Sequence, residues 1–122
     1  MKIIYKYPIR YNPDKNTLYI KVPKGAEVIS TVGLSLDMLE GFIYAIVDPE
    51  LEPTVEREVL LLGTGIPLME EQEEKVLRYQ FLGTHQDGPY IWHIWVEYEG
   101  IDLTEIFGNI FDLDFDATDG KL

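Results

Sequence analysis

The chain has 122 residues, a formal net charge of −12 and no cysteine. This length suits one domain whose core needs no cross-link, and the lack of Cys excludes a disulfide framework, a thiol nucleophile and a thiolate metal site. No apolar run approaches the ~20 residues of a membrane helix, and the N-terminus carries charge where a signal peptide would be apolar, so we expect a soluble, cytoplasmic protein.

The charge is unevenly distributed along the chain. Residues 1–24 hold six basic residues and one acid, a net charge of +5, whereas residues 25–122 hold four basic residues and 21 acids, a net charge of −17. Most of the surface should therefore repel nucleic acid, with the N-terminal part as the exception. This separation of charge also favours a homo-oligomer.

Alternating side chains predict the strands of the first half. Residues 2–11 alternate, and Pro8 indicates an edge strand or the end of a strand. A continuously apolar run, FIYAIV, suits a central strand buried on both faces. The other strands end at turn residues, and the predicted set after the first strand is 17–22, 26–34, 42–47 and 55–62.

The second half centres on a hairpin over 81–99, with the turn placed at 86–89. Residues 76–82 are predicted to form the entry to this hairpin. The acidic run EEQEEK at 70–75 is either a short helical turn or a mobile loop. One face of the second hairpin strand should lie in the middle of the core, and its residues are Tyr90, Trp92, Ile94 and Val96.

The last segment differs in character from the rest. Asp102 and Glu105 have the spacing of a capping box, and the residues after them mix large apolar side chains with aspartates. We expect residues 1–100 to form the β domain and 101–122 to form a short helix and an acidic amphipathic extension that docks on the domain or on a partner subunit. The whole pattern predicts a mainly β fold, a small antiparallel sandwich or partly open barrel of seven or eight strands with one or two short helices.

Two features suggest an anion-binding site. If the first two strands pair, four basic side chains share one surface, and nearby tyrosines could stack a base. The glycine-rich sequence GTGIP offers backbone N–H groups to an anion, although it lacks the Lys-Ser/Thr of a P-loop. Lysines that guard an edge strand, and a simple tight turn, are the structural alternatives. The candidate ligand-binding residues are Lys2, Lys6, Arg10, Lys21, Tyr5, Tyr7, Gly63, Thr64 and Gly65.

No catalytic or metal-binding constellation is apparent. A four-residue turn at 86–89 places His85 opposite Tyr90 and His93 opposite Leu82, so packed or hydrogen-bonded histidines are expected rather than metal ligands. The aspartates near the C-terminus begin like a calcium loop, but Ala117 stands where that loop needs Gly. We therefore expect no cofactor, no metal and no enzymatic activity.

Several short motifs occur in a fixed order along the chain: KYPI at 6–9, PKGA at 23–26, AIVDPE at 45–50, GTGIP at 63–67, FLGT at 81–84 and WHIW at 92–95. In these motifs and their order the chain resembles an uncharacterised family of small phage and prophage proteins. The resemblance covers about residues 1–99 and implies a phage or prophage origin, an all-β domain and no known enzymatic activity. Family members often have a histidine where this chain has Ile66, so a role for that histidine does not transfer. The segment 100–122 extends past the usual end of the domain.

These observations lead to three functional hypotheses for a protein acting inside a bacterial host. The first is a non-enzymatic accessory protein that sequesters a small anionic, nucleotide-like ligand, with counter-defence as its candidate role. The second is an acidic inhibitor that mimics nucleic acid against a host protein, and the third is a component of the virion or its assembly. The second hypothesis uses the acidic residues Glu70, Glu71, Glu73, Glu74, Asp112, Asp114 and Asp116.

Overall fold

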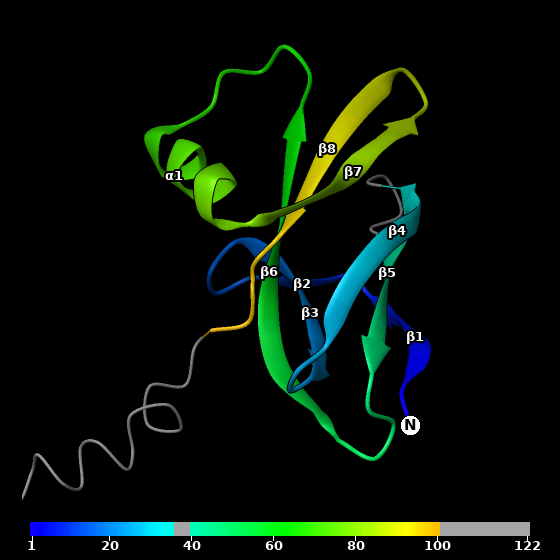
Figure 1. The fold of residues 1–122 in the computed structure, drawn as a ribbon. Coiled ribbons are helices and arrows are strands. Elements are labelled where there is room, and N and C mark those ends of the chain that lie inside the picture. Colours follow the sequence, from blue (N-terminus) through cyan, green and yellow to red (C-terminus); the bar gives the residue numbers. More distant parts are fainter. Residues whose placement is uncertain (36–39, 101–122) are drawn as a thin grey trace, which may run out of the picture.

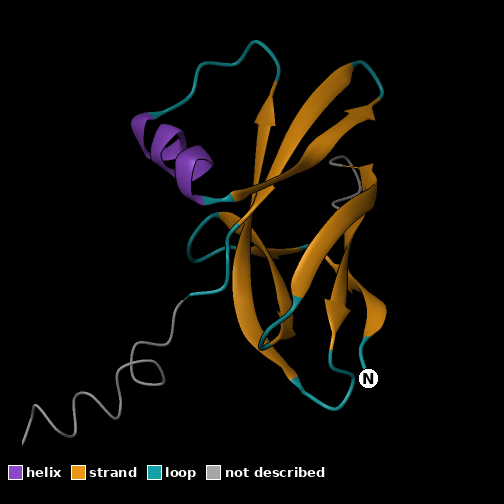
Figure 2. Cartoon of the chain, in the orientation of Figure 1, coloured by secondary structure: helices purple, strands orange, loops and turns teal. Residues whose placement is uncertain are grey.

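The computed structural model describes residues 1–35 and 40–100. The order of elements is shown in Figures 1 and 2, and their bounds are β1 Ile3–Pro8, β2 Arg10–Asn12, β3 Thr17–Pro23, β4 Glu27–Ser35, β5 Glu40–Val47, β6 Pro53–Gly63, α1 Glu70–Arg78, β7 Gln80–Asp87 and β8 Tyr90–Val96. The predicted mainly β class is confirmed. The predicted capping box and C-terminal extension lie outside the described residues.

The strands form two antiparallel sheets, with the orders β1-β5-β4 and β2-β3-β6-β8-β7. They pack face to face as a partly open sandwich and do not close into a barrel within the described part of the chain. The edge strands β4 and β7 approach each other along one side of the sandwich. This contact between the two sheets positions the candidate site described below.

The core lies between the sheets and is built from alternate residues of the inner strands. Its fully buried side chains include Ile20, Ile43, Ile94 and Val96. The predicted core face of β8 is therefore correct for Ile94 and Val96, and Trp92 packs against the core while partly exposed. Tyr90 is predicted in the core but is 63% exposed, because it lies at the tip of the β7–β8 hairpin, opposite Asp87.

The segment predicted as one N-terminal strand forms two strands in different sheets. β1 pairs with β5 up to Pro8, and β2 pairs with β3 from Arg10. Between them the Ile9 N–H donates to the Gly41 carbonyl at 2.8 Å. Pro8 has no N–H to extend a ladder, so the chain changes sheet at this point.

β5 is the central strand of its sheet, as predicted for FIYAIV, but only one face is fully buried. Ile43, Ala45 and Val47 point into the core, whereas Phe42 and Tyr44 are half-buried on the outer face. The expectation of burial on both faces is wrong, because the described elements leave this face partly open to solvent.

The acidic run forms helix α1, which continues to Arg78. The predicted entry to the hairpin over 76–82 is therefore helical at first and becomes a strand only at Gln80. The helix lies against the outer face of β6. Glu58 of β6 accepts hydrogen bonds from the Lys75 ammonium at 2.9 Å and from the Tyr79 hydroxyl at 2.9 Å. Leu60 and Leu62 share that face with Glu58 and are buried.

Candidate functional site

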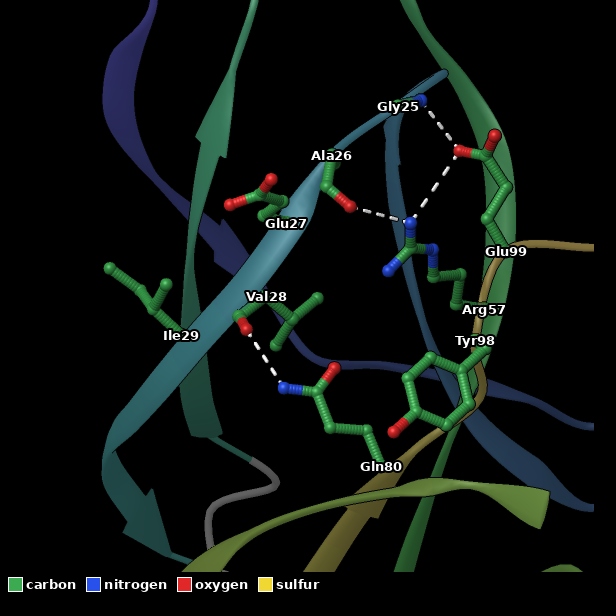
Figure 3. A pocket seen from close by; sticks show the side chains of 9 residues that line it. All are labelled: Gly25, Ala26, Glu27, Val28, Ile29, Arg57, Gln80, Tyr98 and Glu99. Atoms are coloured by element: carbon green, nitrogen blue, oxygen red, sulfur yellow. Dashed lines mark hydrogen bonds and ion pairs between the residues drawn. The ribbon is translucent and has the colours of Figure 1, made fainter.

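The candidate site is built around Arg57, a buried arginine in the middle of β6. Arg57 pairs in register with Ile20 of β3, so its side chain points into the sandwich, and the residue is only 4% exposed. A buried guanidinium is unfavourable unless it is hydrogen-bonded. One terminal nitrogen, Nη2, donates to the Ala26 carbonyl beside β4 at 2.6 Å (Figure 3). Arg57 therefore ties the five-stranded sheet to the edge of the other sheet.

Glu99 supplies the negative charge next to Arg57. Beyond β8 the chain still runs along β6, because the Glu97 N–H donates to the Glu58 carbonyl at 2.9 Å. Two residues later, the Glu99 carboxylate accepts a hydrogen bond from the Gly25 N–H at 2.6 Å and lies 3.5 Å from Arg57 Nη2. Gly25 has φ +81°, a backbone conformation that glycine adopts without strain, and this turn aims its N–H at the carboxylate.

Gln80, at the start of β7, forms a second link between the sheets. Its amide nitrogen donates to the Val28 carbonyl at 3.0 Å. The side chains of Arg57 and Gln80 thus satisfy carbonyls at an unpaired edge, which would otherwise be open to pairing with another chain. This arrangement gives both residues a structural role whether or not a ligand binds.

A pocket of about 460 Å³ opens between these links. Figure 3 shows the second terminal nitrogen of Arg57 directed into it, and the ring of Tyr98, a residue that is 58% exposed, forming one wall. The side chains of Glu27 and Ile29 point to the other side of β4. The pocket is lined by Gly25, Ala26, Glu27, Val28, Ile29, Arg57, Gln80, Tyr98 and Glu99.

Arg57 has unused hydrogen-bonding capacity next to this pocket. Its Nε is buried and has no hydrogen-bond partner among the described residues. A guanidinium offers five N–H donors in a planar fork that matches the oxygens of a carboxylate or phosphate. The arrangement can therefore bind an oxyanion at Arg57, with an aromatic face and an amide group nearby for the rest of a small ligand.

The structure does not bring the predicted basic residues together on one surface. Lys6 lies on β1 of the three-stranded sheet, with its ammonium 4.4 Å from the Phe42 ring centroid. Arg10 and Lys21 lie on the five-stranded sheet, where Lys21 faces Glu56 across the ladder. Lys2 precedes β1. The prediction of one shared surface is wrong, because it required β1 to pair with β3.

The two tyrosines assigned to that surface lie on the opposite side of β1 from Lys6, where Tyr7 packs against the core and Tyr5 is 51% exposed. Tyr5 pairs with Ala45 and Tyr7 with Ile43, both of which are core residues. Their rings make an edge contact with centroids 6.4 Å apart. Burial and the neighbouring Tyr5 raise the pKa of the Tyr7 hydroxyl. Neither ring lies beside the pocket at Arg57.

The glycine-rich sequence forms a tight turn at the end of β6. The Ile66 N–H donates to the Gly63 carbonyl at 3.4 Å, and Gly65 takes φ +81°. The Thr64 N–H donates to the Ile91 carbonyl of β8 at 3.1 Å. This turn lies beside the β7–β8 hairpin tip, far from β1 (Figure 1), so it shares no site with the basic residues.

The hairpin register differs from the prediction and changes the places of both histidines. Asp87 pairs with Tyr90 around a two-residue loop, so His85 lies opposite Trp92 and His93 opposite Thr84. The histidines occupy adjacent rungs on opposite faces of the sheet. The ring of His93 bonds to the Thr64 hydroxyl at 2.8 Å and to the Thr84 hydroxyl at 3.0 Å, which confirms a hydrogen-bonded histidine.

No group of three or more metal-ligating side chains occurs within residues 1–35 and 40–100. Of the predicted acidic surface, Glu70, Glu73 and Glu74 are exposed on α1, and Glu71 pairs with Lys75 at 3.0 Å. The aspartates at 112, 114 and 116 lie outside the described residues.

Sequence reasoning missed Arg57, Gln80, Tyr98 and Glu99 as site residues. Arg57 did carry a signal, because it is the only basic residue between Lys24 and Lys75 and shares the apolar phase of its strand. The other three carried none, since their positions depend on how the two sheets meet.

Within the described residues, no helix is long and apolar enough to cross a membrane.

Comparisons with known proteins add a family but no activity. No curated protein and no solved structure matches the chain. A family model described as a domain of unknown function, DUF7352, matches residues 1–104. Because this match spans most of the chain, the protein belongs to the DUF7352 family.

Proposed function

We propose that this protein is a non-enzymatic binding protein that sequesters a small anionic ligand of nucleotide type in the pocket at Arg57. The observation that carries the proposal is the buried guanidinium, which has an unpartnered Nε and a terminal nitrogen directed into the pocket. In the proposed mode, Arg57 binds the anionic group, because charge-assisted hydrogen bonds to a guanidinium are stronger than those between neutral groups.

Two further residues support a ligand with a flat polar part. The exposed ring of Tyr98 offers a stacking face. The Gln80 amide nitrogen is bonded to Val28, which leaves its oxygen as an acceptor for an exocyclic amino group. As a wider setting, we propose an accessory role in a phage or prophage, acting in the host cytoplasm against a nucleotide signal, as a homo-oligomer.

The test is an NMR titration of the ¹⁵N-labelled protein with adenosine 5′-monophosphate. We expect saturable shifts of the Gly25 amide and the Arg57 Nε–Hε signal, while adenosine, which has no phosphate, leaves the Arg57 signal in place. An unmoved Arg57 signal at saturating nucleotide contradicts the proposal.

Matched arginine variants separate the site from a general charge effect. Arg57→Gln should abolish nucleotide binding, whereas Arg78→Gln removes the same charge from exposed α1 and should leave binding unchanged. Arg57→Lys is the companion variant, since it keeps a cation in the core if Arg57→Gln folds poorly. Unchanged binding by a folded Arg57→Gln protein excludes this pocket.

A second candidate rests on helix α1, which exposes Glu70, Glu73 and Glu74. In this alternative they mimic phosphates and occupy the nucleic-acid groove of a host protein. Such a complex should dissociate steeply with salt and should be lost when all three residues are changed to Gln. A complex that withstands high salt contradicts it.

A further inference from the structure

The Glu99 carboxylate occupies the position in which an external anion would meet Arg57. One of its oxygens, Oε1, is shared by two donors, the Gly25 N–H at 2.6 Å and Arg57 Nη2 at 3.5 Å (Figure 3). A backbone N–H beside a guanidinium is the kind of donor pair that binds a carboxylate or phosphate oxygen. Glu99 thus makes within the chain the contacts that a bound oxyanion would make.

The contact between Glu99 and Arg57 is incomplete. At 3.5 Å it is longer than the 2.7–2.9 Å typical of charge-assisted bonds. It also uses only Nη2, which already donates to Ala26, and leaves Nε without a partner among the described residues. An external oxyanion with several free oxygens could bond to the unused donors, which Glu99 in its present position does not reach.

The two residues differ in how firmly they are held. Arg57 belongs to β6 in the interior of the five-stranded sheet, and its side chain is 5% exposed. Glu99 follows the end of β8, outside any strand, and its side chain is 25% exposed. Moving the Glu99 side chain breaks no ladder bond, so exchange at this site would displace Glu99 and leave Arg57 in place.

We infer that Glu99 is an internal competitor, which fills the anion position in the empty protein and must leave when an external oxyanion binds. This inference rests on the proposed function of the pocket. The alternative is a permanent structural ion pair, for which removal of the charge would weaken the site. The two accounts predict opposite effects of Glu99→Gln on affinity.

The test compares Glu99→Gln with Glu97→Gln in the same adenosine 5′-monophosphate titration. Glutamine keeps an oxygen that can accept from the Gly25 N–H but removes the competing charge. The control removes a charge two residues away, at a side chain that accepts from the Glu58 N–H outside the pocket. We expect Glu99→Gln to lower Kd about tenfold, the effect of one charged hydrogen bond, and Glu97→Gln to leave Kd within about twofold.

A second readout uses the wild-type protein and needs no variant to fold. The side-chain carboxyl ¹³C signal of Glu99 should move as the nucleotide saturates the site, and that of Glu97 should not. Equal or weaker binding by Glu99→Gln, or an unmoved Glu99 signal while the wild type binds, overturns the inference and leaves the proposed function intact. If neither the wild type nor Glu99→Gln binds the nucleotide, both fail.

Discussion

Replacing Arg57 by Met tests whether the guanidinium stabilises the contact between the two sheets. Methionine keeps an unbranched apolar stem of similar length, so the change removes mainly the charged head. The head donates a short bond to the buried Ala26 carbonyl at 2.6 Å and lies 3.5 Å from Glu99. These two contacts set the expected magnitude.

The backbone bond is the larger contribution. A hydrogen bond from a charged donor contributes about 1.5–3 kcal/mol, and the loss would also leave the Ala26 carbonyl unpaired. The pair with Glu99 is long and partly exposed, so we assign it under about 1 kcal/mol. Removing a buried charge returns part of its desolvation free energy. We therefore expect Arg57→Met to lower the free energy of unfolding by about 2 kcal/mol.

The assay is urea unfolding followed by tryptophan fluorescence, with Arg78→Met as the control. The exposed Arg78 should change the free energy of unfolding by under about 0.5 kcal/mol. An Arg57→Met protein as stable as the wild type would refute the structural argument. It would also mean that burial of this arginine brings no stability.

Two further predictions concern the basic residues and helix α1. Lys6→Glu and Lys21→Glu should each leave the binding of adenosine 5′-monophosphate unchanged in the same NMR titration. The reason is that these lysines lie on different sheets and do not line the Arg57 pocket. A loss of binding in either variant would favour the N-terminal basic residues as the anion site. Burial and the hydrogen bond to Glu58 raise the pKa of Tyr79. Above a pH of about 10 the hydroxyl therefore ionises in the unfolded chain but stays protonated in the folded protein. The free energy of unfolding should fall as the pH rises through this range. Urea midpoints between pH 8 and 11 should fall less steeply for Tyr79→Phe, and equal slopes would contradict this.

The sequence was most informative where a local pattern decides the structure. Alternation places Ile94 and Val96 in the core because successive side chains of a strand point to opposite faces. The same rule placed Arg57 in phase with Val59, but it does not state what a buried arginine would meet. That depends on β4, which is 22 residues or more away in the chain and belongs to the other sheet.

Register was harder to predict than the presence of strands. A four-residue turn was expected in the hairpin, yet the ladder continues to Asp87 and Tyr90. Gly88, with φ +59°, followed by Pro89 suits the two-residue loop whose twist matches that of paired strands. Moving the turn changed the partner of each histidine, so that His93 lies opposite Thr84 and His85 opposite Trp92.

The proposed anion site at Arg57 differs from the exposed N-terminal lysines in its electrostatic surroundings. Residues 1–24 carry +5, but an anion that approaches an exposed lysine there also meets the field of residues 25–122, which carry −17. Salt screens that field over about 8–10 Å, whereas a contact inside the pocket depends on the groups that touch the ligand. At Arg57 those groups include one carboxylate, Glu99, which lies outside the strands. In the proposed mode an anion displaces that one side chain, which belongs to no strand, so that no ladder bond has to break.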